Sequence, residues 1–443
     1  MNSPRLNLTQ TPPLAVPLRF FLTAPWFGVV AGLLLAAAGP SALASRWTPA
    51  ALAMTHLLVL GLITMTMWGA LLQLFPVLLG TGIPRPRSAA AVFHGLLTLG
   101  VVLLAAGLWR PAPTLVAAGA AALVAAVVSF VVLAGYAVCR SGWRSLSARV
   151  FAAGLGALAV AAGLGSTLAA GHAGAPFGIL RSLTDLHAAW GLLGWIAAVV
   201  MGVAFQVVPM FYAARGYPRA LTAALSAAVL AALLGMSAAS TAPAAAGIAL
   251  PAGALAAAAL SVFALWTLGL QSRRLRSRPD VPLQLWRTAM GSLLGASILW
   301  ALCRVWDIPV LSERLPELLG ALYIVGFAAS LVNAMLYKIV PFLIWLHLTQ
   351  LRGARRVRGA VPHMGSIIPE RHMRWQFRAQ TGALLALIMA VLWPQPWAYP
   401  AGVLLALGWF GLWLNIFKAA QLHRRAAAVD DGWWEAPSRA RST

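Results

Sequence analysis

Two histidines occupy matching positions in the chain, each near the start of a long apolar segment. His56 lies in LAMTHLLVLG and His187 in TDLHAAWGLLG, and they precede Pro76 and Pro209 by 20 and 22 residues. Neutral imidazole is a good ligand for a redox metal when its second nitrogen is held by a hydrogen-bond acceptor. This spacing therefore predicts a metal or cofactor site built from equivalent residues of two helices.

The surroundings of the two histidines leave two interpretations open. We expect Thr55 or Asp185 to orient the imidazoles, and His172, in GHAGAPFG, is a candidate third metal ligand. In the other interpretation, each histidine is an interfacial residue bonded to a backbone carbonyl. Because the chain has no CxxC or CxxCH motif, thiolate clusters and c-type haem are not expected.

The elements that must position these histidines are membrane-spanning helices. Of 443 residues, 61% are hydrophobic and only 9% are charged, and apolar runs long enough to cross about 30 Å of hydrocarbon recur throughout. We predict an all-α polytopic membrane protein that forms a single membrane domain over residues 1–443 and has the lipid bilayer as its partner. The predicted spans are 19–41, 50–79, 88–108, 112–138, 149–171, 184–213, 218–239, 244–268, 287–306, 317–348, 377–393 and 398–418.

Basic residues alternate between the predicted connections in a way that sets the orientation. Most lie in the connections on the side of the N terminus, whereas the other side receives only Arg46, Arg110, Arg181, Arg304 and Arg314. Because basic residues are retained in the cytoplasm, we predict that both termini are cytoplasmic, as in a protein of a bacterial-type inner membrane. The net charge of +23 then reflects topology, and no nucleic-acid partner is expected.

Three segments of the chain repeat one pattern around a proline. Pro76, Pro209 and Pro341 are spaced by 133 and 132 residues. Small residues precede them by seven and fifteen positions: Gly69, Gly202 and Ala334, and Gly61, Gly194 and Gly326. Since the period holds four spans, an even number, we predict three parallel, pseudo-symmetric four-helix repeats. The predicted repeats are about 19–138, 149–268 and 287–418, and a tail covers 419–443.

Polar residues stand three positions before these prolines, as Gln73, Gln206 and Lys338. A proline frees a backbone carbonyl one turn earlier, and a nearby amide can bond to it, so a structural role fits both glutamines. The lining of a polar path is the alternative. Lys338 either extends toward the membrane surface along its aliphatic stem or acts with Tyr337 on an anionic group.

Carboxylates are placed only in loops, tails or helix ends. All nine, from Asp185 to Glu435, follow this pattern. A proton-coupled transporter needs an acid inside the membrane, so this class is disfavoured.

The span pattern and the two histidines resemble the catalytic subunit I of haem-copper oxidases and nitric oxide reductases, and the twelve-helix NnrS-type haem and copper proteins. In that family the outer end of the second helix carries a low-spin haem ligand, where His56 stands, and the sixth helix supplies an active-site metal ligand, where His187 stands. The family's histidines of the seventh and tenth helices have no counterpart here. The resemblance thus implies one b-type haem held by His56 together with His187 or a weak sixth ligand, or copper held by the two histidines. A descendant without any cofactor is the alternative.

Two functions of different classes follow. The resemblance implies a haem- or copper-binding inner-membrane protein in electron transfer or nitric oxide-related redox chemistry, with other membrane or electron-transfer subunits as partners. The alternative is a non-redox transporter, channel or assembly partner whose interior is lined by Gln73, Gln206 and Lys338. Whether the protein is an enzyme stays open in both.

Overall fold

The computed structural model describes residues 12–143, 145–178, 180, 182–274, 279–306, 308–355 and 361–428, and every regular element among them is a helix. In chain order these are α1 (Ala15–Ala38), η2 (Gly39–Leu43), α2 (Pro49–His56), η3 (Leu57–Thr64), α3 (Met65–Leu79), α4 (Pro86–Trp109), α5 (Pro113–Arg140), α6 (Leu146–His172), α7 (Ser182–Ala189), η4 (Trp190–Ala197), α8 (Ala198–Tyr212), α9 (Arg219–Thr241), η5 (Pro243–Ile248), α10 (Ala249–Ser272), α11 (Val281–Val305), α12 (Pro309–Glu313), α13 (Leu315–Gly320), η6 (Ala321–Ala329), α14 (Ser330–Arg355), α15 (Met364–Ile367), α16 (Glu370–Leu392) and α17 (Pro394–Ala428).

Twelve helices among the described residues are long and apolar enough to cross a membrane, which confirms the predicted number. Three of them are composite, because a distorted segment joins two α-helical parts. By their order in the chain we call them span 2 (Pro49–Leu79), span 6 (Leu183–Tyr212) and span 10 (Leu315–Arg352). These are the spans that carry Pro76, Pro209 and Pro341.

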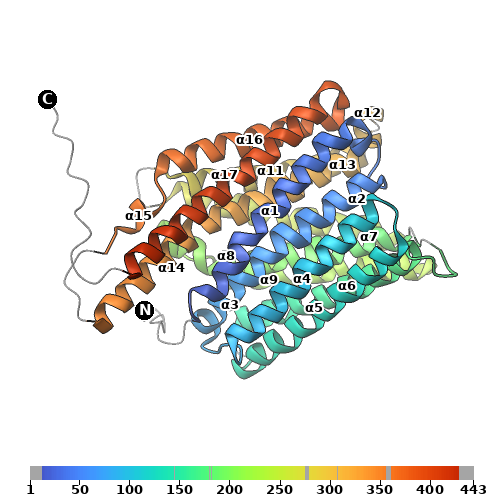
Figure 1. Cartoon of the computed structure of the whole chain (residues 1–443). Helices are drawn as coiled ribbons and strands as arrows, with labels where there is room; N and C mark the ends of the chain where they lie inside the picture. The colour runs from blue at the N-terminus through green and yellow to red at the C-terminus, as the bar shows by residue number, and fades with distance from the viewer. Residues whose placement is uncertain are drawn as a thin grey trace.

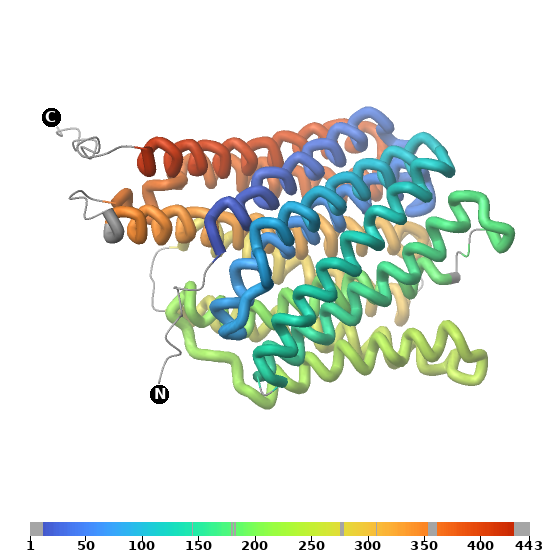
Figure 2. Tube along the Cα trace, turned by 60° about the horizontal axis from the view of Figure 1, so that its bottom comes forward, coloured from blue at the N-terminus to red at the C-terminus, as the bar shows by residue number. Residues whose placement is uncertain are grey.

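The helices run roughly side by side in one bundle, and α1 begins at the end where α17 finishes (Figure 1). The first and last spans are neighbours in both views (Figure 2). A Cβ placed on Gly32 of α1 would lie 2.5 Å from the backbone nitrogen of Ala406, so the two helices touch through their backbones. We call the end where α1 begins the basic end and the opposite end the histidine end.

Local signals explain where several helices start and stop. The side chains of Thr48, Ser145 and Asp280 accept hydrogen bonds from the first turns of α2, α6 and α11, as N-caps do. α3 and α8 end just before Gly80 and Ala213, which lie four residues beyond the prolines and adopt left-handed backbone conformations. Such a residue terminates a helix, so these two spans stop there.

Span 10 differs from the other two composite spans. Its last element, α14, continues fourteen residues past Pro341 to Arg355. The last helix, α17, continues to Ala428, so residues 419–428, which were predicted as part of the tail, are helical. Arg181 and residues 275–278, 356–360 and 429–443, on which part of the orientation argument rests, lie outside the described residues.

A stretch of π-helix interrupts each composite span. These stretches are η3, η4 and η6, which begin at residues 57, 190 and 321. π-Helix is rare and is concentrated at functional sites. Gly61, Gly194 and Gly326, each fifteen residues before the proline of its span, lie inside the three stretches.

These glycines allow each composite span to approach the helix that precedes it. A Cβ on Gly61 would lie 2.3 Å from the Phe27 ring of α1, and one on Gly194 would lie 2.7 Å from Ala157 of α6. A Cβ on Gly326 would lie 2.5 Å from the Ser292 side chain of α11. Close backbone approach at small residues is the usual mode of helix packing in membranes.

Hydrogen bonds between the π-helical stretches tie the three composite spans together. Trp195 in η4 donates its Nε1–H to the Thr64 hydroxyl of η3 over 3.0 Å. Tyr323 in η6 donates its hydroxyl hydrogen to the Leu192 carbonyl of η4 over 2.8 Å. Span 2, span 6 and span 10 therefore meet at the middle of the bundle.

Candidate functional site

His56 and His187 lie side by side at the histidine end. His56 is the last residue of α2, and His187 lies in α7, so each stands just before the π-helical stretch of its own span. Their ring centroids are 6.3 Å apart, and the ring planes differ by 24°. Both residues are half-buried. The structure thus brings together the two histidines that the sequence singled out.

The two imidazoles are oriented in the same way. Nδ1 of His56 lies 2.8 Å from the Leu52 carbonyl oxygen, and Nδ1 of His187 lies 2.9 Å from the Ala161 carbonyl oxygen. A carbonyl oxygen can only accept, so each Nδ1 carries the hydrogen and each Nε2 keeps a lone pair in the neutral ring. This is the arrangement by which proteins orient a histidine for a metal.

The predicted acceptors, Thr55 and Asp185, are not the ones used. Leu52 lies one turn before His56, where its carbonyl points along the helix toward the imidazole, while the side chain of Thr55 is exposed. Asp185 precedes His187 by two residues and so projects from another face of α7. A carbonyl on a neighbouring helix takes its place.

A notch in α6 holds the ring of His187. A Cβ on Gly165 would lie 2.8 Å from Cε1 and 3.2 Å from Nδ1 of His187. Gly165 is one turn after Ala161, the residue whose carbonyl accepts from this ring. Only the absence of a side chain at Gly165 lets the imidazole lie against the α6 backbone.

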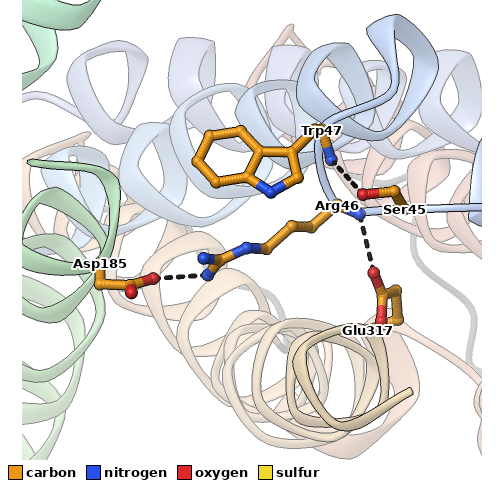
Figure 3. A network of polar contacts seen from close by, with 5 residues as sticks. All are labelled: Ser45, Arg46, Trp47, Asp185 and Glu317. Carbon is orange, nitrogen blue, oxygen red and sulfur yellow. Dashed lines mark hydrogen bonds and ion pairs between the residues drawn. The ribbon is translucent and has the colours of Figure 1, made fainter. Parts of the chain in front are cut away.

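A polar clasp at the histidine end joins the start of span 2 to span 6 and span 10. The Arg46 guanidinium is 2.5 Å from the Asp185 carboxylate, and the Arg46 backbone N–H donates to Glu317 Oε1 over 2.7 Å. The Arg46 side chain passes beneath the Trp47 ring, whose centroid is 4.8 Å away (Figure 3). Asp185 belongs to the same helix as His187, so the clasp restrains the element that carries this imidazole.

His172 does not complete a three-ligand set. It is the last residue of α6 and half-buried. Over the described parts of the chain, no three His, Cys, Asp or Glu side chains are grouped as metal ligands would be. The candidate donor set is therefore the two imidazoles.

A cavity of about 60 Å³ lies where the three composite spans meet, and its walls are almost wholly apolar. Its lining residues are Thr66, Met67, Ala70, Leu71, Leu74, Val199, Val200, Val203, Ala204, Trp286, Leu331, Val332, Met335, Leu336 and Ile339. Gln73, Gln206 and Lys338 are not among them. Gln73 is buried elsewhere, and Gln206 is exposed on the outside of α8.

Lys338 forms an ion pair near the basic end. Its Nζ lies 2.5 Å from Asp280 Oδ2, and its side chain is 14% exposed. Asp280 Oδ1 also caps α11 by accepting from the Leu283 N–H over 3.0 Å. This pair is compatible with the expected extension of Lys338 toward the membrane surface, because Asp280 stands at the start of α11.

Tyr337 belongs instead to a buried network of neutral polar groups. Its hydroxyl donates to Gln376 Oε1 over 3.2 Å and accepts from Asn415 Nδ2 over 2.9 Å. Asn333 Nδ2 also donates to Gln376 Oε1, over 2.9 Å. The network links α14, α16 and α17, whereas Lys338 faces α11.

A second histidine pair lies at the basic end and was missed in the sequence. His347 Nδ1 and His423 Nε2 are 2.7 Å apart, so one ring donates to the other. The contact forms because α17 is long enough to bring His423 against α14. The two residues are far apart in the chain and share no motif, so the sequence carries no signal for this contact.

These features define a class, that of multi-pass helical membrane proteins. No model of a known protein family matches the chain, and no curated protein matches it in sequence.

Proposed function

We propose that this protein binds a redox metal centre, the iron of a b-type haem or a copper ion, through Nε2 of His56 and His187. The observation that carries the proposal is the pairing of two imidazoles whose Nδ1 atoms are both held by backbone carbonyls. Interfacial histidines bonded to carbonyls need not face each other. Here they come from two spans and lie 6.3 Å apart.

The two residues fit such a centre by chemistry and by spacing. Neutral imidazole is a common ligand of both haem iron and copper. The ring centroids lie 6.3 Å apart, close enough for one metal ion to be held between the two rings. When bound, the centre would supply one-electron transfer or the binding of a gas such as nitric oxide.

The protein's own groups hold and aim the two ligands. The Leu52 and Ala161 carbonyls fix the orientation of the rings, and Gly165 leaves space for His187. The Arg46–Asp185 clasp restrains α7 at the membrane surface.

The scaffold that we propose is a divergent relative of haem-copper oxidase subunit I and of NnrS-type proteins, built from three parallel four-helix repeats. Three π-helical stretches with starts 133 and 131 residues apart, and three equivalent glycines packed on the preceding helix, support the repeat. The alternation of basic residues supports cytoplasmic termini in a bacterial-type inner membrane. A single centre is proposed because the oxidase ligands of the seventh and tenth helices have no counterpart.

The test is the absorption spectrum and metal content of the purified protein, with His56→Ala and His187→Ala as variants and His172→Ala as the matched control. Haem binding predicts a Soret band that both site variants lose and the control keeps. Copper binding predicts about one metal per chain with the same dependence. If haem-supplied and copper-supplied cells both yield a colourless, metal-free protein, the proposal is wrong and a non-redox function remains.

A further inference from the structure

The cavity at the junction of the three composite spans is lined by corresponding residues of each span. Counted back from Pro76, Pro209 and Pro341, every span contributes the residues ten, nine, six and five positions before its proline. Residues three and four positions apart lie on one face of a helix, so three corresponding faces enclose the space. The twelve residues are Thr66, Met67, Ala70 and Leu71 in α3, Val199, Val200, Val203 and Ala204 in α8, and Leu331, Val332, Met335 and Leu336 in α14.

The walls of this cavity offer no hydrogen bond to an occupant. Thr66 is the lining residue with a hydroxyl group, and that hydroxyl donates to the Leu62 carbonyl of its own span over 2.8 Å. The indole nitrogen of Trp286 is covered by other atoms and adds no polar surface to the walls. A buried water needs about two to four polar partners, so water is disfavoured here.

The volume of the cavity limits the size of an apolar occupant. A dry apolar cavity of about 150 Å³ accepts benzene, whereas this one measures about 60 Å³. An aromatic ring or a length of acyl chain is therefore too large, and a molecule of one or two heavy atoms fits. Such a molecule would gain the dispersion contacts that an empty space forfeits.

We propose that the central cavity binds a small, uncharged gas molecule of one or two heavy atoms. The site is separate from the proposed metal centre, because Met67 follows His56 by eleven residues, or about 16 Å along a helix. None of the lining residues is proposed as a metal ligand. The inference therefore goes beyond the proposed function and does not depend on it.

Dissolved oxygen, a paramagnetic diatomic gas, is the probe that tests this site. The full chain is prepared in detergent micelles with isotope-labelled methionine methyl groups, and their nuclear magnetic relaxation is compared under oxygen and under nitrogen. Met67 and Met335 line the cavity, whereas Met65 and Met290 are buried outside it. Oxygen should enhance the relaxation of the two cavity methyl groups several-fold more than that of the other two. Equal enhancement of all four would overturn the proposal.

Variants that fill the cavity show whether the oxygen is bound there. Ala70→Val adds two carbon atoms inside the cavity, and Ala198→Val adds them at a half-buried alanine of α8 outside it. The excess relaxation should be lost in Ala70→Val and kept in Ala198→Val, and its persistence in Ala70→Val would overturn the proposal. The effect should also persist in His56→Ala, so a failure of the metal centre is distinguishable from a failure of the gas site.

Xenon keeps the test decisive if the filling variant does not fold. In crystals of the wild-type protein under xenon pressure, a xenon atom should lie among the twelve lining residues. Crystals without xenon at this position would overturn the proposal.

Discussion

Lys338 in span 10 bonds to Asp280, and the same carboxylate begins α11. One side chain thus serves an ion pair and a helix cap. Asp280→Asn keeps the cap and loses the charge, and because the pair is partly exposed we expect a loss of about 1 kcal/mol or less in the free energy of unfolding. Asp280→Ala should cost about 1 kcal/mol more, since α11 also loses its cap. Equal losses in unfolding experiments would contradict the double role.

The buried network around Gln376 allows a comparison between two neighbouring glutamines. Gln376 Oε1 accepts from Asn333 and Tyr337, whereas both amide atoms of Gln380 lack partners although the residue is 1% exposed. Gln376→Leu should destabilise the fold by about 2–4 kcal/mol, because two buried donors are left unpaired. Gln380→Leu should be neutral or stabilising. Denaturant unfolding measures the free energy of unfolding of the two variants. A larger loss in Gln380→Leu than in Gln376→Leu would contradict the prediction and show that Gln380 has a partner.

The notch at Gly165 predicts a specific effect on the proposed metal centre. In Gly165→Ala, the added methyl group would meet the His187 ring at 2.8 Å, so the imidazole must shift. We expect bound metal or haem to fall at least several-fold. Gly163→Ala, where a Cβ meets nothing within 4 Å, is the control. If metal analysis gives the same stoichiometry for both variants, the ring is not held as described.

Glycines inside the π-helical stretches predict a stability effect. Gly61→Ala or Gly326→Ala forces a methyl into a neighbouring helix and should cost about 1–3 kcal/mol by overpacking. Gly95→Ala, at an exposed site with open space, should be neutral or slightly stabilising. Thermal unfolding of the three variants is the measurement. A tolerated Gly61→Ala would mean that α1 and span 2 can move apart at little cost.

The two halves of the clasp should differ in strength. The Arg46–Asp185 pair is exposed, with side chains 37% and 73% accessible, so Asp185→Asn should cost less than about 1 kcal/mol. Glu317→Ala leaves the Arg46 backbone N–H without its acceptor and should cost more, about 1–3 kcal/mol. Glu313→Ala, an exposed acid nearby, is the control. Unfolding midpoints of the variants give the order of the stability losses. Because salt screens the exposed ion pair, the loss in Asp185→Asn should shrink at high salt, whereas that in Glu317→Ala should not.

The twelve helices were predictable because a helix that crosses the hydrocarbon needs about 20 apolar residues, and runs of that length are visible in the sequence. The closeness of His56 and His187 was also predictable, because they stand at similar distances, 20 and 22 residues, before the repeated prolines. Their hydrogen-bond acceptors were not. A backbone carbonyl has no sequence signature, and Ala161 becomes the acceptor only through the packing of α6 on span 6.

Other features depend on tertiary contacts in the same way. Gln73 and Gln206 both stand three positions before a proline, yet Gln73 is buried and Gln206 is exposed, because their spans have different neighbours. The pairing of Lys338 with Asp280, and of His347 with His423, joins residues far apart in the chain. The π-helical stretches have the composition of ordinary apolar helix, so hydropathy cannot distinguish them.

The π-helical stretches also bear on how the protein tolerates changes in length. A π turn holds roughly one residue more than an α turn, so η3 rotates the residues before it by about 100° relative to those after it. His56 and Pro76 therefore face directions that an unbroken helical wheel would not give. Deleting one residue between them would rotate the imidazole away from its partner, although the hydrophobicity of the span would not change and its length would change very little. The number of residues in span 2 and in span 6 thus determines the direction in which each histidine points.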